Sequence, residues 1–270
     1  MKQLISIALF LSITYSANSQ SADFFYQKGN GEYDLTKDYK AAIIDYTKAI
    51  KINPKFVDAY YHRGEAKKKL NDNIGAIADY TSAILLNPKH LYSYSARARS
   101  KMNINEFKGA IMDYRKAKEI NPNDIYNYFF IAEAKDSLKD YLGAIDQFSK
   151  VLEIEPNNAD AYCGIGDLKT KLQDYSGAFA AYRMSIQIEP NTVQAYYSMA
   201  TTKFKLEDYR GAIEDYSKTI DLNPQLAESF YFRGLAKIKL EQKENGCMDL
   251  SKAGEFGYKS AYESIRLNCK

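Results

Sequence analysis

The sequence predicts an all-α solenoid, in which helix pairs are stacked in tandem. Its prolines recur at intervals of 34 residues, at Pro54, Pro88, Pro122, Pro156, Pro190 and Pro224. Between the prolines, small and aromatic residues recur in register. A fixed period of this length is typical of stacked helical repeats. Because proline lacks a backbone N–H and disfavours the helical conformation in the residue before it, each proline marks the end of a helix.

Each period is predicted to contain two helices. In residues 57–90, the second half carries Ala76, Tyr80 and Ala83, whose spacings of four and three place them on one face of an α-helix. Asp72 precedes this face by four residues, where its carboxylate can accept hydrogen bonds from the free N–H groups of the first turn. The unit is therefore two helices of about 14 residues joined by a tight turn.

Small residues are predicted where the two helices of a pair cross, because helices approach to about 8–10 Å only where the contacting side chains are short. The crossing pairs are Gly29 and Ala42, Gly64 and Ala76, Ala98 and Ala110, Ala132 and Ala144, Gly166 and Ala178, Ala200 and Ala212, and Gly234 and Gly246. Larger residues are expected beside each crossing: Tyr46, Tyr80, Tyr114, Phe148, Tyr182, Tyr216 and Leu250. A further glycine recurs without an evident reason at Gly75, Gly109, Gly143, Gly177 and Gly211.

These columns resemble the tetratricopeptide repeat family. One copy meets the family pattern with Tyr196, Ala200, Tyr209, Ala212, Tyr216, Ile220 and Pro224. The resemblance implies a right-handed superhelix of seven repeats over residues 22–260, divided as 22–56, 57–90, 91–124, 125–158, 159–192, 193–226 and 227–260. The first copy is one residue longer, around Thr36 and Lys37, and the seventh lacks the closing proline.

Residues 1–19 have the pattern of a secretory signal peptide. Lys2 is their only charged residue, the apolar run 4–13 is too short to span a membrane, and residues 17–19 suit a signal peptidase. The first cysteine is Cys163, which excludes a lipid anchor near the cleavage site. We therefore expect a soluble bacterial protein exported to the periplasm or the cell exterior, without a membrane span. The alternative is a buried N-terminal helix.

The C-terminal segment 261–270 is predicted to form an amphipathic capping helix, which would cover the apolar face left by the last repeat. An exported protein meets an oxidising compartment, so Cys247 in the last repeat and Cys269 in the cap are expected to form a disulfide. The alternative is that both are small buried residues. Cys163 then remains unpaired, and no histidine near it in sequence suggests a reactive role.

Composition and motifs argue against an enzyme and against nucleic-acid binding. The chain has 37 Lys and Arg against 34 Asp and Glu, and these charges alternate along the helices instead of forming a basic stripe. It has only 2 histidines, and no metal-ligand motif, nucleophile motif or phosphate-binding glycine loop is recognisable. We expect no catalytic residue, no metal site and no cofactor.

The family resemblance implies a concave groove lined by the first helix of each repeat. The candidate groove residues are Tyr61, His62, Tyr92, Arg99, Tyr126, Phe129, Phe130, Glu133, Tyr197, Phe204, Tyr231 and Phe232. Aromatic side chains dominate interface energetics, so a scaffold of the cell envelope that binds a peptide segment or partner helix is the leading hypothesis. Any one of these residues could instead pack against a neighbouring repeat. A small-ligand (glycan) receptor and a self-assembling structural component are the alternatives, and the oligomeric state is unknown.

Overall fold

The computed structural model describes residues 21–269, so the predicted signal peptide at 1–19 lies outside the described residues. Within 21–269 the chain forms helices and no strand. The helices are α2 (Ala22–Gly31), the π-helix η1 (Glu32–Thr36), α3 (Tyr39–Ile52), α4 (Val57–Lys69), α5 (Asn73–Leu86), α6 (Leu91–Asn103), α7 (Phe107–Ile120), α8 (Ile125–Ser137), α9 (Tyr141–Ile154), α10 (Ala159–Lys171), α11 (Tyr175–Ile188), α12 (Val193–Lys205), α13 (Tyr209–Leu222), α14 (Ala227–Lys239), α15 (Lys243–Glu255) and α16 (Ser260–Asn268).

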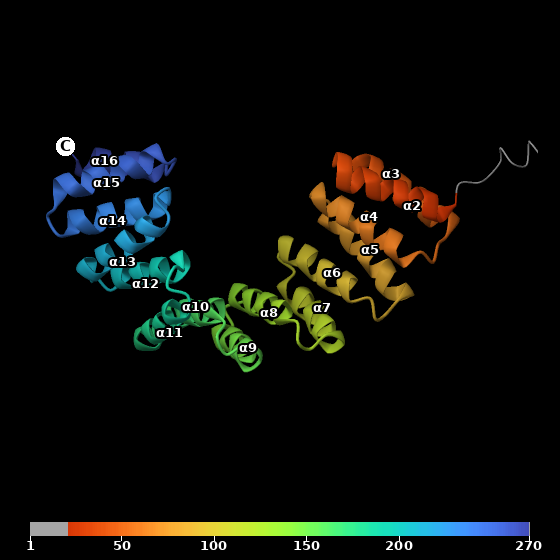
Figure 1. Ribbon diagram of the computed structural model, residues 1–270, viewed down its shortest axis with the longest axis horizontal. Coiled ribbons are helices and arrows are strands. Elements are labelled where there is room, and N and C mark those ends of the chain that lie inside the picture. Colours follow the sequence, from red (N-terminus) through yellow and green to blue (C-terminus); the bar gives the residue numbers. More distant parts are fainter. Residues whose placement is uncertain (1–20, 270) are drawn as a thin grey trace, which may run out of the picture. The chain divides into compact units, whose positions relative to one another are not determined.

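Consecutive helices pack as pairs, from α2 with α3 to α14 with α15 (Figure 1). The chain divides into two compact units between Pro122 and Asn123, so that α2–α7 form the first unit and α8–α16 the second. Within each unit the second helix of a pair also contacts the first helix of the next pair, as α5 does with α6. First helices contact one another as well, α4 with α6, α10 with α12, and α12 with α14. The predicted all-α solenoid is confirmed.

Four second helices, α5, α9, α11 and α13, begin at an aspartate cap, and this cap explains the recurring glycine that follows it. Helix α7 begins at Glu106 without a side-chain capping bond, so Gly109 is not explained in this way. Asp72 Oδ1 accepts a hydrogen bond of 2.8 Å from the backbone N–H of Gly75, and a Cβ on Gly75 would clash with Asp72 Oδ2. The same bond recurs for Asp140 with Gly143, Asp174 with Gly177, and Asp208 with Gly211. In the first pair, Asp38 caps Ala41 at 3.0 Å. Glycine therefore makes room for one orientation of the capping carboxylate. It is not essential for the capping hydrogen bond, because Asp38 forms the same bond with an alanine.

The turn inside each pair contains one residue in the left-handed region of φ. These residues recur every 34 positions, at Lys37, Asn71, Asn105, Lys139, Gln173, Glu207 and Glu241. The extra residue of the first copy does not disturb this register, because it is absorbed just before Lys37 by the π-helix η1. A π-helical turn is wider than an α-helical turn and accommodates a one-residue insertion in this way.

The predicted core residues fill each pair. Tyr46, Tyr80, Tyr114, Tyr182, Tyr216 and Leu250 are almost completely buried, and Phe148 is partly buried. At the second crossing, Gly64 lies against the ring of Tyr80, where a Cβ would come within 2.6 Å of a ring carbon. The small residue of the first helix thus makes room for the aromatic ring of the second.

An arginine in the first helix of three pairs ties together three helices, which the sequence analysis did not predict. Arg63 donates to the Asp79 carboxylate from Nε at 3.0 Å and from Nη2 at 2.6 Å, and its Nη1 donates to Thr47 Oγ1 of the preceding pair at 3.1 Å. Lys67 Nζ also contacts Asp79, at 2.8 Å. The same arrangement joins Arg97, Asp113 and Thr81, and Arg233, Asp249 and Ser217. We call this arrangement the arginine clasp.

In the last pair, two glycines bring the backbones of α14 and α15 into contact at the crossing. A Cβ on Gly246 would lie 2.7 Å from the backbone oxygen of Gly234 and 2.6 Å from Ile238 Cγ1, although the other copies carry alanine at this position. We expect Gly246→Ala to destabilise the protein by about 1–3 kcal/mol in urea denaturation, because backbone atoms cannot yield as a side chain does. Gly109→Ala is the control, since the nearest atom is Lys101 Cδ at 3.2 Å. Equal stabilisation by both changes would contradict this account.

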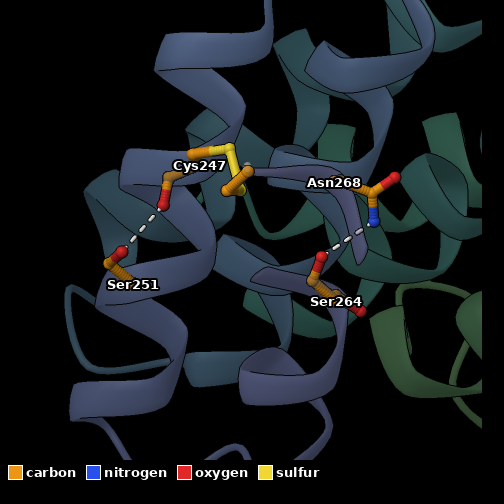
Figure 2. Close-up of a disulfide and its surroundings, with 5 residues drawn as sticks. Cys247, Ser251, Ser264 and Asn268 are labelled. Atoms are coloured by element: carbon orange, nitrogen blue, oxygen red, sulfur yellow. Dashed lines mark hydrogen bonds between the residues drawn. A yellow bond between two sulfur atoms is a disulfide. The ribbon is translucent and has the colours of Figure 1, made fainter. Parts of the chain in front are cut away.

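The C-terminal helix α16 (Ser260–Asn268) packs on α15, as predicted for a cap. It begins one residue before the expected segment 261–270. Cys247 in α15 and Cys269 are joined by the predicted disulfide, with Cα atoms 5.8 Å apart (Figure 2). Ala261 is fully buried, which fixes the cap against the last pair. None of the helices in the described part of the chain combines the length and the apolar character needed to cross a bilayer.

Candidate binding surface

A cavity in the second unit is lined by aromatic residues of α8 and by parts of α9 and α10. Its volume is about 650 Å³. Four predicted groove residues line it together: Tyr126, Phe129, Phe130 and Glu133. The other lining residues are Ile125, Phe148, Glu155, Asn158 and Asp160. We call this site the aromatic cavity.

Helix α8 presents these side chains because their spacing of three and four places them on one face. Asp124 caps the helix by accepting a hydrogen bond of 3.1 Å from the N–H of Tyr126. The ring of Phe129 packs edge-on against Phe148, with centroids 5.2 Å apart, whereas Tyr126 is 67% exposed. Phe129 is therefore part of the packed base of the aromatic cavity, and Tyr126 is available for contact.

The aromatic cavity is acidic. Glu133, Glu155 and Asp160 line it and are exposed, and no lysine, arginine or histidine is among its lining residues. Asn158 Nδ2 donates to Glu155 Oε2 at 2.9 Å, which holds one of these carboxylates in place. Asp160 was not among the predicted groove residues, although it stands 34 residues after Tyr126 on the first helix α10, and this register could have indicated it. Phe148 and Glu155 lie outside the first helices, so a prediction confined to the first helices could not include them.

A smaller cavity in the first unit gathers three other predicted residues, Tyr61, Tyr92 and Arg99. Its volume is about 190 Å³, and Glu65, Lys68, Ser95 and Ala96 complete the lining. Tyr92 is 66% exposed, and its ring centroid lies 6.3 Å from that of Tyr61. Burial raises the pKa of Tyr61. We call this site the first-unit cavity.

His62, another predicted groove residue, is engaged in packing. Its Nδ1 lies 2.9 Å from the backbone oxygen of Asp58 and 3.2 Å from Tyr26 Oη. Its ring meets those of Tyr26 and Tyr61 edge-on, at 5.4 and 5.0 Å between centroids. These contacts give His62 a structural role between the first helices α2 and α4.

Tyr197 lines two further cavities of the second unit. One, of about 410 Å³, is formed with Val193, Gln194, Leu226 and Glu228. The other, of about 200 Å³, is polar and is lined also by Asp167, Thr170, Lys171, Tyr182, Ser198, Thr201, Thr202 and Lys205. In the polar cavity, Tyr182 Oη donates to Asp167 Oδ1 at 2.9 Å, and burial raises the pKa of the Asp167 carboxyl.

Phe204, Tyr231 and Phe232 pack inside the second unit, and none of them lines the cavities described above. The ring of Phe232 stacks on Tyr216 at 6.1 Å and meets Phe204 edge-on at 5.9 Å. Tyr231 packs on Tyr258 at 4.5 Å between centroids, and its hydroxyl lies 3.2 Å from Ser264 Oγ of α16. These contacts join neighbouring helices of the second unit and tie them to the cap.

Cys163 is a free, buried thiol, and we expect it to be unreactive in the folded protein. Burial raises the pKa of Cys163 to about 12, and the nearby Asp167 acts in the same direction. Since an ordinary cysteine has a pKa of about 8.5 and only the thiolate reacts, iodoacetamide at pH 8.5 should modify the folded chain very slowly and the urea-unfolded chain rapidly. Intact mass spectrometry measures both rates. Fast labelling of the folded chain would show that this thiol is accessible.

Comparisons with known proteins agree with the helix-pair architecture. A family model described as tetratricopeptide repeat matches residues 57–90, 91–124, 125–158, 159–192 and 193–226, and a second, described as TPR repeat, matches residues 32–71. No curated protein matches the chain. The solved structure of a tetratricopeptide repeat protein from Parabacteroides merdae is 22% identical, with a TM-score of 0.74, and the match covers 93% of this chain and 100% of that one.

Two other solved structures are similar over a part of the chain. MamA is 20% identical with a TM-score of 0.59, covering 63% of this chain and 92% of its own. YrrB, described as a TPR protein with an unusual peptide-binding site, is 19% identical with a TM-score of 0.53, covering 68% of this chain and 95% of its own. At these identities the structural likeness shows the fold alone. The repeated family match, which extends over more than half of the sequence, shows that the chain belongs to the tetratricopeptide repeat family.

Proposed function

We propose that this protein is a non-enzymatic scaffold of the cell envelope that binds an extended segment or a helix of a partner protein. The aromatic cavity carries the proposal, because it combines an exposed tyrosine with a packed aromatic base in about 650 Å³. Clustered aromatic side chains in a pocket supply most of the binding energy at many interfaces. Family membership supports a role in protein–protein interaction, and one similar structure, YrrB, is described as having a peptide-binding site.

Placement in the envelope rests on two features. The sequence predicts a signal peptide at residues 1–19, and the disulfide between Cys247 and Cys269 is compatible with an oxidising compartment. A small-ligand receptor is the less favoured function. The polar cavity measures about 200 Å³, below the roughly 300 Å³ at which small-molecule sites usually begin, so its size does not favour a small ligand there.

Site-specific photo-crosslinking in the native envelope tests the proposal. A photoreactive phenylalanine analogue at Tyr126, which is 67% exposed, should capture a partner protein. The matched control is the same analogue at Leu142, which is 71% exposed and lies on the second helix α9 of the same unit. Capture at Tyr126 but not at Leu142 is the expected result. Equal capture at both positions, or capture only at Leu142, would show that the aromatic cavity is not the binding site.

A further inference from the structure

We propose that the aromatic cavity binds a lysine or arginine side chain of the partner segment. This inference rests on the proposed function and specifies the chemistry of the ligand. Among the residues that line the aromatic cavity, Glu133, Glu155 and Asp160 carry negative charge and none carries positive charge. The acidity is local, since the whole chain has a formal net charge of +3.

A long basic side chain fits both the aromatic rings and the carboxylates of the aromatic cavity. Its hydrocarbon stem can pack on apolar rings while its charged end remains near solvent and carboxylates. A cation within about 6 Å of a tyrosine or phenylalanine ring is also attracted by the negative face of the ring. Tyr126 exposes such a ring, and Glu133 follows it two helical turns later on the same face of α8. An acidic side chain would be repelled there, and a purely apolar one would leave the carboxylates uncompensated.

The preceding repeat provides a natural contrast within the same chain. Tyr92 stands 34 residues before Tyr126 and is equally exposed, at 66% against 67%. Arg99 stands 34 residues before Glu133. The two cavities therefore share a tyrosine in register, but the first-unit cavity has a positive charge where the aromatic cavity has the negative charge of Glu133. The first-unit cavity contains Lys68 and Arg99 against one carboxylate, so we expect it not to favour a basic ligand.

The test is selection of peptides from a phage-displayed random library on the chain without residues 1–19. Selected peptides should be enriched in lysine or arginine at one position. In a synthetic peptide from that pool, replacing the lysine by norleucine should weaken binding about tenfold, which corresponds to one cation–π contact and one exposed ion pair. Affinity is measured by fluorescence anisotropy at low and high salt, and the lysine effect should shrink at high salt.

Variants separate this inference from the proposed function. Tyr126→Ala should abolish the enrichment, Glu133→Gln should weaken it, and Glu133→Arg, which copies the preceding repeat, should weaken it further, because one cation then opposes the two remaining carboxylates. Tyr92→Ala should leave the basic preference unchanged. Peptides that need Tyr126 but contain no basic residue would overturn this inference and leave the proposed function standing. Selection that yields no peptide, or peptides indifferent to Tyr126, would overturn both.

Discussion

Replacing Asp79 by alanine is expected to lower the free energy of unfolding by about 3–5 kcal/mol, the usual cost of removing one partner of a buried ion pair. Asp79 is 3% exposed and accepts hydrogen bonds from Arg63, which is itself mostly buried, while Lys67 forms a second ion pair with it. Its loss leaves the arginine between α4 and α5 without its counter-charge. Urea denaturation followed by circular dichroism measures the change.

The control for this prediction comes from the fourth copy, where Ile131 and Gln147 occupy the positions of Arg63 and Asp79. The double variant Arg63→Ile with Asp79→Gln should recover most of the lost stability, because it removes both charges together. If Asp79→Ala is as stable as the unchanged protein, or if the double variant is the less stable of the two, the arginine clasp does not contribute as described.

Replacing Cys269 by serine is expected to cost about 3 kcal/mol, because the disulfide closes a loop with a sequence separation of 22 residues. The loss should be confined to the last pair and the cap, since each repeat of a solenoid contacts only its neighbours. Hydrogen exchange should therefore increase in α15 and α16 and remain unchanged in α4 and α5.

Reduction with dithiothreitol should reproduce the effect of Cys269→Ser in the unchanged protein and add nothing in the variant. Cys163→Ala keeps the disulfide and serves as the control, because its thiol is not bridged. Uniformly increased exchange along the chain would show instead that the cap stabilises the whole protein as one cooperative unit.

The fold could be predicted from the sequence because the same structural signals recur in each copy of the repeat. The 34-residue spacing, the aspartate caps and the buried tyrosines each recur, so the helix pairs and their core did not depend on any single residue. The disulfide between Cys247 and Cys269 could be predicted because the compartment and the position of the cap limited the possible partners. The π-helix η1 could not, because a one-residue insertion near Thr36 gives no sign of whether a turn or a helix absorbs it.

The binding surface was less predictable. The position of a residue within its repeat predicts the face of the helix on which it lies, but it does not predict whether other side chains cover that face. Tyr126 and Phe232 were both assigned to the groove, yet Tyr126 is exposed and Phe232 stacks on Tyr216. The arginine clasp was missed for a related reason. Arg63 and Asp79 recur at the repeat period, but their spacing does not reveal that they face each other across two helices.

The turn residues with positive φ leave this protein below the stability that its fold permits. Lys139, Gln173, Glu207 and Glu241 have φ values of 60–63°, a conformation that costs a residue with a Cβ roughly 1 kcal/mol or more compared with glycine. Asparagine, already present at Asn71 and Asn105, tolerates the same conformation. Replacing these four residues by glycine or asparagine should therefore raise the free energy of unfolding, and the gains should add because the positions lie in separate repeats. An engineer seeking a heat-resistant version could begin with these turns and leave every cavity unchanged.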